Sequence, residues 1–298
     1  MKPLHIALAV LIMAIWGINF SVIKLGLTNV DPLILAGLRF SLCALPAIFF
    51  VRRPDVPWRY LIGYGLVFGI GLWGIVNLGI KAGLSAGIAS LVLQFSAFFS
   101  ILLGSWVFRE ALNRFQILGM LIALSGLLSV IVISDGSVSL LGMLLVLVGA
   151  LSMSVANIIN KKANTRDVFA FLVWSSAFSP IPLFALDYAI NGSVGYIMFV
   201  NHIGATAVLS ILFQVYPNTL FAYWIWNLLL KTYPISTVAP LSLLVPIFGM
   251  LGSVVIFNEH MSTGKVLAVL LIVTGLSVGL YGRRIFDGLI GRDGRVLR

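Results

Sequence analysis

The chain alternates between long apolar runs and short polar breaks along almost all of its length. An α-helix that crosses a bilayer needs about 20 mostly apolar residues. Ten runs meet this requirement, and they predict spans at residues 6–26, 33–51, 60–80, 87–108, 116–133, 140–160, 169–190, 205–230, 236–257 and 264–281. Most of the breaks are short, so the pattern predicts an all-α membrane protein without a soluble domain.

The arrangement of apolar and polar positions in the first half of the chain recurs in the second half. Residues 89–126 and 238–275 each contain an apolar run, a short break with a glutamate, and a second apolar run. Pairs of identical residues at one constant spacing support this match: Phe99 and Phe248, Phe108 and Phe257, Glu110 and Glu259, Leu118 and Leu267, Gly126 and Gly275. Asn19 with Asn157 and Lys24 with Lys162 match at a second spacing.

Each half contains five predicted spans. Because five is odd, the second half enters the membrane from the opposite side, and the two halves are inverted repeats. Inverted repeats are typical of secondary transporters, whose substrate site lies near the midplane between the halves. The alternative is that a gene duplication only built a stable helical bundle.

Composition and charge agree with a membrane protein. Hydrophobic residues make up 60% of the chain and charged residues 9%, whereas soluble domains carry roughly 25% charged residues. The net charge of +10 is unevenly distributed. With the N-terminus in the cytoplasm, fifteen lysines and arginines fall on cytoplasmic segments, and Lys24, Lys81 and Lys265 fall on the other side. This asymmetry predicts cytoplasmic termini and a lipid bilayer as the partner, with no role in nucleic-acid binding.

The first apolar run is interpreted as a retained span. It is longer than the apolar core of a signal peptide and lacks a small-residue cleavage pattern. The chain has one cysteine, Cys43, inside a span, so we expect no disulfide within the chain and no cysteine-based metal site.

Prolines interrupt several spans. Each removes a backbone hydrogen bond and leaves a carbonyl without its donor. Pro217 interrupts the eighth span, and Pro240 and Pro246 bracket a short stretch of the ninth. These prolines are predicted either as hinges or as static kinks.

A few polar residues inside the spans are candidate ligands for a substrate, because polar groups in hydrocarbon usually face a cavity or a partner. Arg39 lies inside the second span and can bind a carboxylate with two hydrogen bonds; alternatively it reaches the interface or pairs with Asp31. Lys24 either assists Arg39 or anchors a span end. Asn19 and Asn157 either bind substrate or bond to each other across the two halves.

Aromatic residues lie deep in the same spans, near these polar residues. We expect Trp16, Phe95, Tyr223 and Trp226 to form the walls of a pocket that is mainly apolar with a few polar anchors. Ordinary packing is the alternative for each of them.

Several classes of chemistry have no support in the sequence. No Asp or Glu lies in the middle of a span, which argues against an antiporter with a midplane carboxylate. There is no Walker A motif and no cluster of His, Asp and Glu. We therefore expect no cofactor, no metal site, no catalytic residue and no enzyme activity.

Several segments resemble the drug/metabolite transporter superfamily, EamA type. They are residues 16–20 (WGINF), Lys24 and residues 31–40 (DPLILAGLRF). Residues 87–94, 157–162 and 239–246 resemble the bacterial O-acetylserine/cysteine exporter branch. The resemblance implies an inner-membrane exporter with ten spans in two EamA repeats. The candidate polar residues that fall in matching segments are Asn19, Lys24, Arg39, Gln94 and Asn157.

The sequence departs from this resemblance at residues 221–226. Tyr223 is followed by Trp224, where the resemblance implies a glycine beside the tyrosine. The bulkier pair is expected to narrow or reshape the pocket.

Together these observations predict a secondary transporter that exports small amino acids or related metabolites, similar to cysteine or O-acetylserine, by alternating access. The first repeat is expected at residues 1–138, the second at 139–282, and a disordered basic cytoplasmic tail at 283–298. The oligomeric state is left open, with a monomer among the options. The alternatives are a broader exporter of aromatic or cationic compounds, and a membrane scaffold that transports nothing.

Overall fold

The computed structural model describes residues 1–109, 111–131, 136–233 and 238–293. Within these ranges all regular secondary structure is helical. Nine helical stretches in the described residues are long and apolar enough to cross a membrane, and Leu241–Phe257 is a shorter apolar helix. These ten stretches overlap the ten predicted spans, of which residues 132–133 and 236–237 lie outside the described residues, and this confirms the predicted fold class.

The first repeat contains spans 1 to 5. Span 1 is α1 (Pro3–Gly26); span 2 is α2 (Pro32–Ala44) with η1 (Ala47–Phe49); span 3 is α3 (Trp58–Leu66), η2 (Val67–Gly74) and α4 (Ile75–Lys81); span 4 is α5 (Ala86–Leu93) and α6 (Phe95–Phe108); span 5 is α7 (Arg114–Ile131).

The second repeat contains spans 6 to 10. Span 6 is α8 (Leu140–Ala163); span 7 is α9 (Val168–Ser176) and α10 (Pro180–Asn191), followed by α11 (Val194–His202); span 8 is α12 (Ala205–Phe213), η3 (Gln214–Phe221) and α13 (Ala222–Thr232); span 9 is η4 (Ala239–Leu243) and α15 (Leu244–Phe257); span 10 is α16 (Thr263–Asp293).

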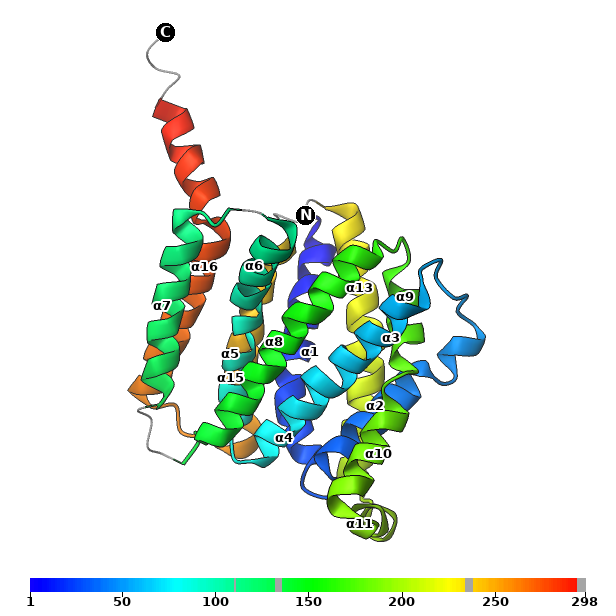
Figure 1. The fold of residues 1–298 in the computed structure, drawn as a ribbon. Coiled ribbons are helices and arrows are strands. Elements are labelled where there is room, and N and C mark those ends of the chain that lie inside the picture. Colours follow the sequence, from blue (N-terminus) through cyan, green and yellow to red (C-terminus); the bar gives the residue numbers. More distant parts are fainter. Residues whose placement is uncertain (110, 132–135, 234–237, 294–298) are drawn as a thin grey trace.

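The packing of the helices follows the internal repeat. α1 packs against α15 and η3, and its counterpart α8 packs against α6 and η2. α1 and α8 run in opposite directions through the bundle, as inversion requires (Figure 1). α7 and α16, the last spans of the two repeats, pack against each other at one side of the bundle (Figure 1). Each repeat therefore supplies helices to the other, and neither forms a separate body.

Two chain reversals lie at equivalent positions of the two repeats. Arg109 after α6 and Asn258 after α15 both adopt the left-handed conformation, with φ of 55° and 51°. This conformation ends a helix sharply. Glu259 follows the second reversal, whereas its sequence counterpart Glu110 lies outside the described residues.

Spans 3 and 8 each contain a π-helical segment at matching places. Val67–Gly74 and Gln214–Phe221 both interrupt an otherwise α-helical span. Pro217 lies within the second segment, at one of the predicted hinge positions, and Pro240 lies in the 3₁₀ segment η4. The first segment contains no proline, and the sequence analysis did not predict it. π-Helical turns are rare and occur frequently at functional sites.

The prediction of a disordered tail is wrong for residues 283–293, because α16 continues as a helix to Asp293. No proline interrupts this stretch. The Phe286 ring contacts the Phe115 ring with centroids 5.5 Å apart, and the Arg114 guanidinium lies 4.5 Å from the Phe286 centroid. These contacts hold the helix against the start of α7.

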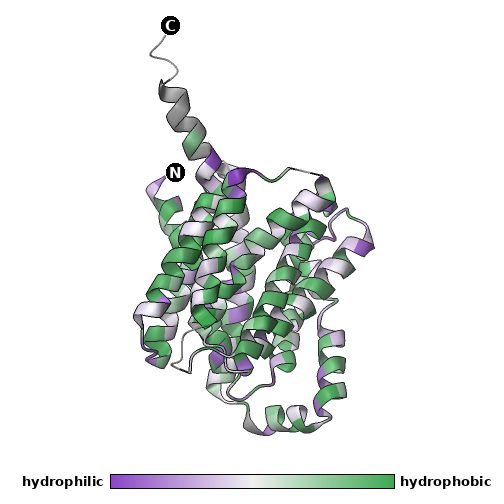
Figure 2. Cartoon of the chain, turned by 60° about the vertical axis from the view of Figure 1, so that its left-hand side comes forward, coloured by the Kyte–Doolittle hydropathy of each residue, from purple (hydrophilic) through white to green (hydrophobic). Residues whose placement is uncertain are grey.

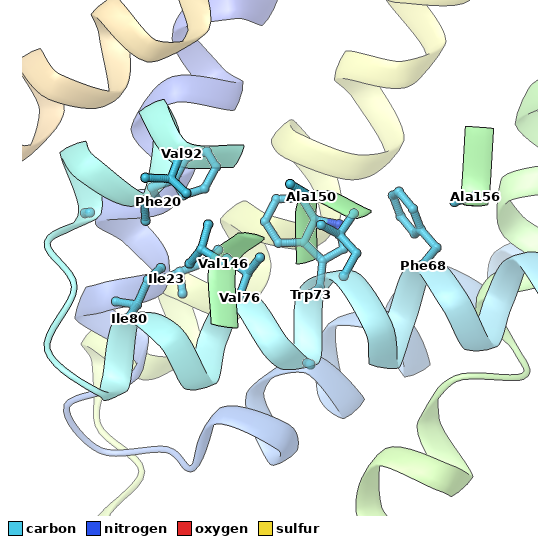
Figure 3. Close-up of a cluster of buried hydrophobic side chains, with 14 of the residues drawn as sticks. Phe20, Ile23, Phe68, Trp73, Val76, Ile80, Val92, Val146, Ala150 and Ala156 are labelled. Atoms are coloured by element: carbon cyan, nitrogen blue, oxygen red, sulfur yellow. The ribbon is translucent and has the colours of Figure 1, made fainter. Parts of the chain in front are cut away.

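Apolar side chains cover the outer surface of the spans and also fill the interior. Figure 2 shows apolar residues over most of the helical surface. Among them Leu121, Leu209 and Val255 are exposed, as lipid-facing residues are. In the interior, residues from spans 1, 3, 4 and 6 form one cluster around Phe20 and Trp73 (Figure 3). The bundle is therefore apolar on both sides of its helices, and its few buried polar residues are distinctive.

Close contact between α7 and α16 generates a stability prediction. A Cβ atom at Gly275 would lie 2.6 Å from the Gly119 carbonyl oxygen and the Ala123 nitrogen, so Gly275→Ala should separate the helices and lower Tm. Gly104→Ala is the control, because no described atom lies within 4 Å of the added carbon and alanine favours a helix by about 1 kcal/mol over glycine. Thermal unfolding in detergent compares the two. Equal Tm changes would contradict the helix contact.

Candidate functional site

Arg39 is buried in the interior of the bundle, with 1% of its surface exposed. It lies on α2, whose first residue is Pro32. Its Nε and Nη2 donate hydrogen bonds to the Thr219 hydroxyl oxygen, at 3.2 and 2.9 Å. The Nη1 atom is buried without a hydrogen-bond partner among the described residues. Arg39 therefore retains hydrogen-bonding capacity after its protein contacts are made.

The two π-helical segments hold this guanidinium from both repeats. Thr219 belongs to η3, and its hydroxyl donates to the Gln214 carbonyl at 2.7 Å, which leaves its oxygen oriented to accept from Arg39. Trp73 belongs to η2, and its ring centroid lies 4.2 Å from the Arg39 Cζ, a cation–π contact. The Trp73 Nε1 is also buried without a partner among the described residues. Two unpaired N–H donors thus lie on side chains that touch each other.

An aromatic group adjoins Arg39 and contains three of the predicted wall residues. The Trp16 ring lies 5.2 Å from Tyr223 and 5.5 Å from Trp226 between centroids. Tyr223 in turn lies 6.4 Å from Phe68, in an edge-on arrangement. Trp16 Nε1 donates to the Asn218 carbonyl at 3.1 Å, which fixes the indole against η3. Asn218 immediately precedes Thr219, the acceptor of Arg39, so the predicted residues Arg39, Trp16, Tyr223 and Trp226 come together around η3.

Acceptor atoms without partners occur on the same helices. Asn19 is fully buried, and neither its Oδ1 nor its Nδ2 has a partner among the described residues. Asn19 lies three residues after Trp16, so the two side chains share a face of α1. Gln214 Oε1 and Asn218 Oδ1, both in η3, are also buried without partners in the described part of the chain. Buried amide oxygens without donors are uncommon and call for a ligand or an explanation.

The other predicted site residues lie elsewhere. Asn157 is exposed on α8 and donates to Ser100 Oγ at 3.2 Å. Gln94 lies at the junction of α5 and α6, and Phe95 packs against Phe98 with centroids 5.8 Å apart. Lys24 forms an ion pair with Glu259 at 2.9 Å.

Two alternatives from the sequence analysis are excluded by these contacts. Asn19 and Asn157, both described, do not bond to each other, because the amide atoms of Asn19 have no partner within the described ranges and Asn157 bonds to Ser100. Arg39 does not reach the interface or pair with Asp31, because its burial in the bundle directs it to Thr219.

Two cavities lie at opposite ends of the bundle. One of about 410 Å³ is lined by Ser100, Gln116, Asn157 and Lys161, at the end where α1 begins and where α16 leaves the bundle. We call this end the terminal side. A second cavity of about 300 Å³ is lined by residues that include Lys24, Glu259 and Lys265, at the opposite side.

Sequence reasoning did not select Thr219 or Trp73 as site residues. Thr219 lies two positions after Pro217, so the proline in span 8 indicates the segment that contains Thr219 but not the residue itself. Trp73 lies in the glycine-rich segment of residues 69–74, where small residues allow close approach of other helices. In neither case does the sequence show which residue faces Arg39.

Known proteins resemble this chain over nearly its full length. The profile of the EamA-like transporter family matches residues 3–132 and 140–280. A protein of Escherichia coli strain K12 named "Probable amino-acid metabolite efflux pump" is 41% identical, over 93% of this chain and 95% of its own. A protein of Salmonella typhimurium with the same name is 40% identical, over 93% and 95%.

A solved crystal structure matches the fold with a TM-score of 0.63. The match covers 96% of this chain and 100% of the other, at 19% sequence identity. At this identity the likeness concerns the fold alone.

The hydrogen bonds of Arg39 generate a stability prediction. Thr219→Val keeps the shape of the side chain but removes the acceptor of a buried cation, so it should reduce stability by about 1–3 kcal/mol. Thr232→Val is the control, since Thr232 is an exposed threonine whose hydroxyl bonds within its own helix, and its effect should stay within about 0.5 kcal/mol. Thermal unfolding measures both. A Thr219→Val protein as stable as the Thr232→Val protein would rule out the role of this hydroxyl.

Proposed function

Because this chain belongs to the EamA-like transporter family, we propose that it exports amino acids or closely related metabolites, and that Arg39 binds their carboxylate. Family membership makes the protein a membrane transporter and not an enzyme. Beyond this, we propose the amino-acid substrate, the binding residues and the alternating-access mechanism.

The observation that carries the proposal is the buried guanidinium with an unpaired nitrogen. Ionised side chains within membrane spans are costly and usually mark a substrate pathway. Among the described residues, the Arg39 guanidinium has one neutral acceptor, Thr219, and its Nη1 has no hydrogen-bond partner. An arginine N–H group forms strong, charge-assisted hydrogen bonds with a carboxylate. The nearby Trp73 Nε1 offers a second donor of neutral character.

The acceptors nearby suit the amino group of the same substrate. An ammonium group donates three hydrogen bonds. In α1 and η3, the amide oxygens of Asn19, Gln214 and Asn218 have no hydrogen-bond partner in the part of the chain that the structure describes. The faces of Trp16, Tyr223 and Trp226 also attract a cation. The site therefore complements a zwitterion. Its N–H donors match the carboxylate, and its amide oxygens and aromatic rings match the ammonium group.

We further propose that both termini are cytoplasmic and that the membrane is the bacterial inner membrane. The excess of lysine and arginine on the terminal side supports this orientation. The larger cavity then opens toward the cytoplasm, where an exporter collects its substrate. Asn157 lines that cavity and is proposed as a polar contact on the entry path, with Gln94 and Phe95 on the neighbouring span.

Counterflow in proteoliposomes tests the substrate and Arg39 together. The panel contains labelled cysteine, O-acetylserine, threonine and an aromatic amino acid. Saturable uptake of one class is expected, and Arg39→Gln should reduce uptake at least tenfold because a charged hydrogen-bond partner of the carboxylate is lost. Arg59→Gln is the matched control, since it removes an exposed arginine that lies against Tyr60. Melting curves confirm that each variant is folded.

Other results of this experiment would replace the proposal. Wild-type uptake by Arg39→Gln would remove Arg39 from the site. Uptake inhibited by unrelated apolar cations and not by amino acids would indicate the broader exporter. Absence of any flux, together with a stable protein partner, would indicate a scaffold.

The indole of Trp73 generates a separate prediction. Trp73→Phe keeps an aromatic face near Arg39 but removes the Nε1 donor, so the apparent KM should rise about threefold to tenfold with little change in maximal rate. Trp224→Phe is the control, because Trp224 is 55% exposed. Concentration dependence of counterflow gives both parameters. A KM that changes equally in the two variants would argue against a contact between Trp73 and substrate.

A further inference from the structure

An ion pair joins the two repeats on the side opposite to the termini. Lys24 is in the last turn of α1, in the first repeat, and Glu259 follows α15, in the second. Their Nζ and Oε1 atoms are 2.9 Å apart. We propose that Lys24, Glu259 and Phe257 form a latch that holds the outer side of the transporter closed. The latch rests on the proposed function, since it requires alternating access and the proposed orientation.

The ion pair is partly shielded from water and lies against an aromatic ring. The Lys24 Nζ also lies 4.3 Å from the centroid of the Phe257 ring. The side chain of Glu259 is 15% exposed and that of Lys24 is 34% exposed. Partial shielding from water strengthens a charge interaction relative to a fully solvated pair. The ammonium group thus has both an anion and a ring face as partners from the second repeat.

The segment that carries Glu259 is itself held in place. Asn258 adopts the left-handed conformation that ends α15, so the chain reverses direction immediately before Glu259. The Lys265 Nζ donates to the His260 carbonyl at 3.0 Å and is almost fully buried. This bond ties the reversal to the start of α16. The hydrogen bond from Lys265 therefore stabilises the turn that places Glu259 next to Lys24.

The position of the latch along α1 suits a gate. α1 and α15 are in close contact at Gly17, where an added Cβ would lie 2.7 Å from the Gly249 nitrogen. Lys24 lies seven residues further along α1, about 10 Å at 1.5 Å per residue. The tight contact leaves little room for movement at Gly17, while the helix ends can separate around it. An ion pair at those ends controls the separation.

Lys24 and Glu259 of the latch also line the outer cavity of about 300 Å³, together with Ile80, His260 and Lys265. Ile80 is 4% exposed, so a probe at this position reports whether the cavity has opened. Separation of Lys24 from Glu259 would expose it to the outer solution. This gives a measurement that needs no substrate.

The experiment uses Ile80→Cys in a Cys43→Ala background, because Cys43 is the single native cysteine. A membrane-impermeant maleimide is applied to spheroplasts and, separately, to inside-out vesicles. Lys24→Gln or Glu259→Gln should increase labelling from the outer side about twofold to fivefold, as expected for loss of a partly exposed ion pair. The exchange Lys24→Glu with Glu259→Lys should return the rate toward that of the unmodified latch.

Lys81→Gln is the matched control. It removes a lysine on the same side that donates to the Leu27 carbonyl at 2.8 Å and does not line the latch cavity, and it should leave the labelling rate unchanged. Equal melting temperatures exclude general loosening of the fold.

The latch is overturned if the single variants label at the unmodified rate, or if the charge exchange labels as fast as the single variants. It is also overturned if Lys81→Gln accelerates labelling as much as Lys24→Gln. Labelling as expected, without exchange of any amino acid in counterflow, would retain the latch and reject the amino-acid substrate. The two proposals therefore fail separately.

Discussion

The burial of one guanidinium group inside a bilayer-spanning bundle constrains much of this structure. A charge in hydrocarbon is tolerated only with partners, and Arg39 has them from two other spans: the Thr219 hydroxyl in η3 and the Trp73 ring in η2. These partners come from opposite repeats. The position of α2, the orientation of both π-helical segments and the interface between the repeats therefore depend on one another through this side chain.

Much of the fold could be predicted from the sequence, because apolar length and the count of spans follow directly from the bilayer. The repeat and the unusual position of Arg39 within a span were also visible, since an arginine within an apolar run is rare. The contacts of Arg39 were not, because Thr219 lies 180 positions away and nothing local shows which helices meet. The π-helical turn at Val67–Gly74 has no proline to mark it. The contact of Phe286 with Phe115 in the helix beyond residue 283 is likewise long-range.

The predicted site residues separate by depth in the bundle, which helps to distinguish their roles. Arg39, Trp16, Tyr223 and Trp226 lie with the two π-helical segments, whereas Asn157 and Lys24 line cavities at opposite ends. A substrate that crosses the bundle would meet these groups in sequence. Residues that look equivalent in a hydropathy profile thus lie at different depths of the bundle.

The paired π-helical segments have a mechanical consequence. A π turn holds more residues per turn than an α turn, so each segment is wider and shorter than the same residues would be as α-helix. If a segment rewinds to α-helix, the part of the span beyond it must rotate and advance along its axis without unfolding. Trp73 and Thr219 lie in these two segments. Such rewinding would therefore move the Trp73 ring and the Thr219 hydroxyl relative to the Arg39 guanidinium, so a change in helix length would alter the contacts of Arg39.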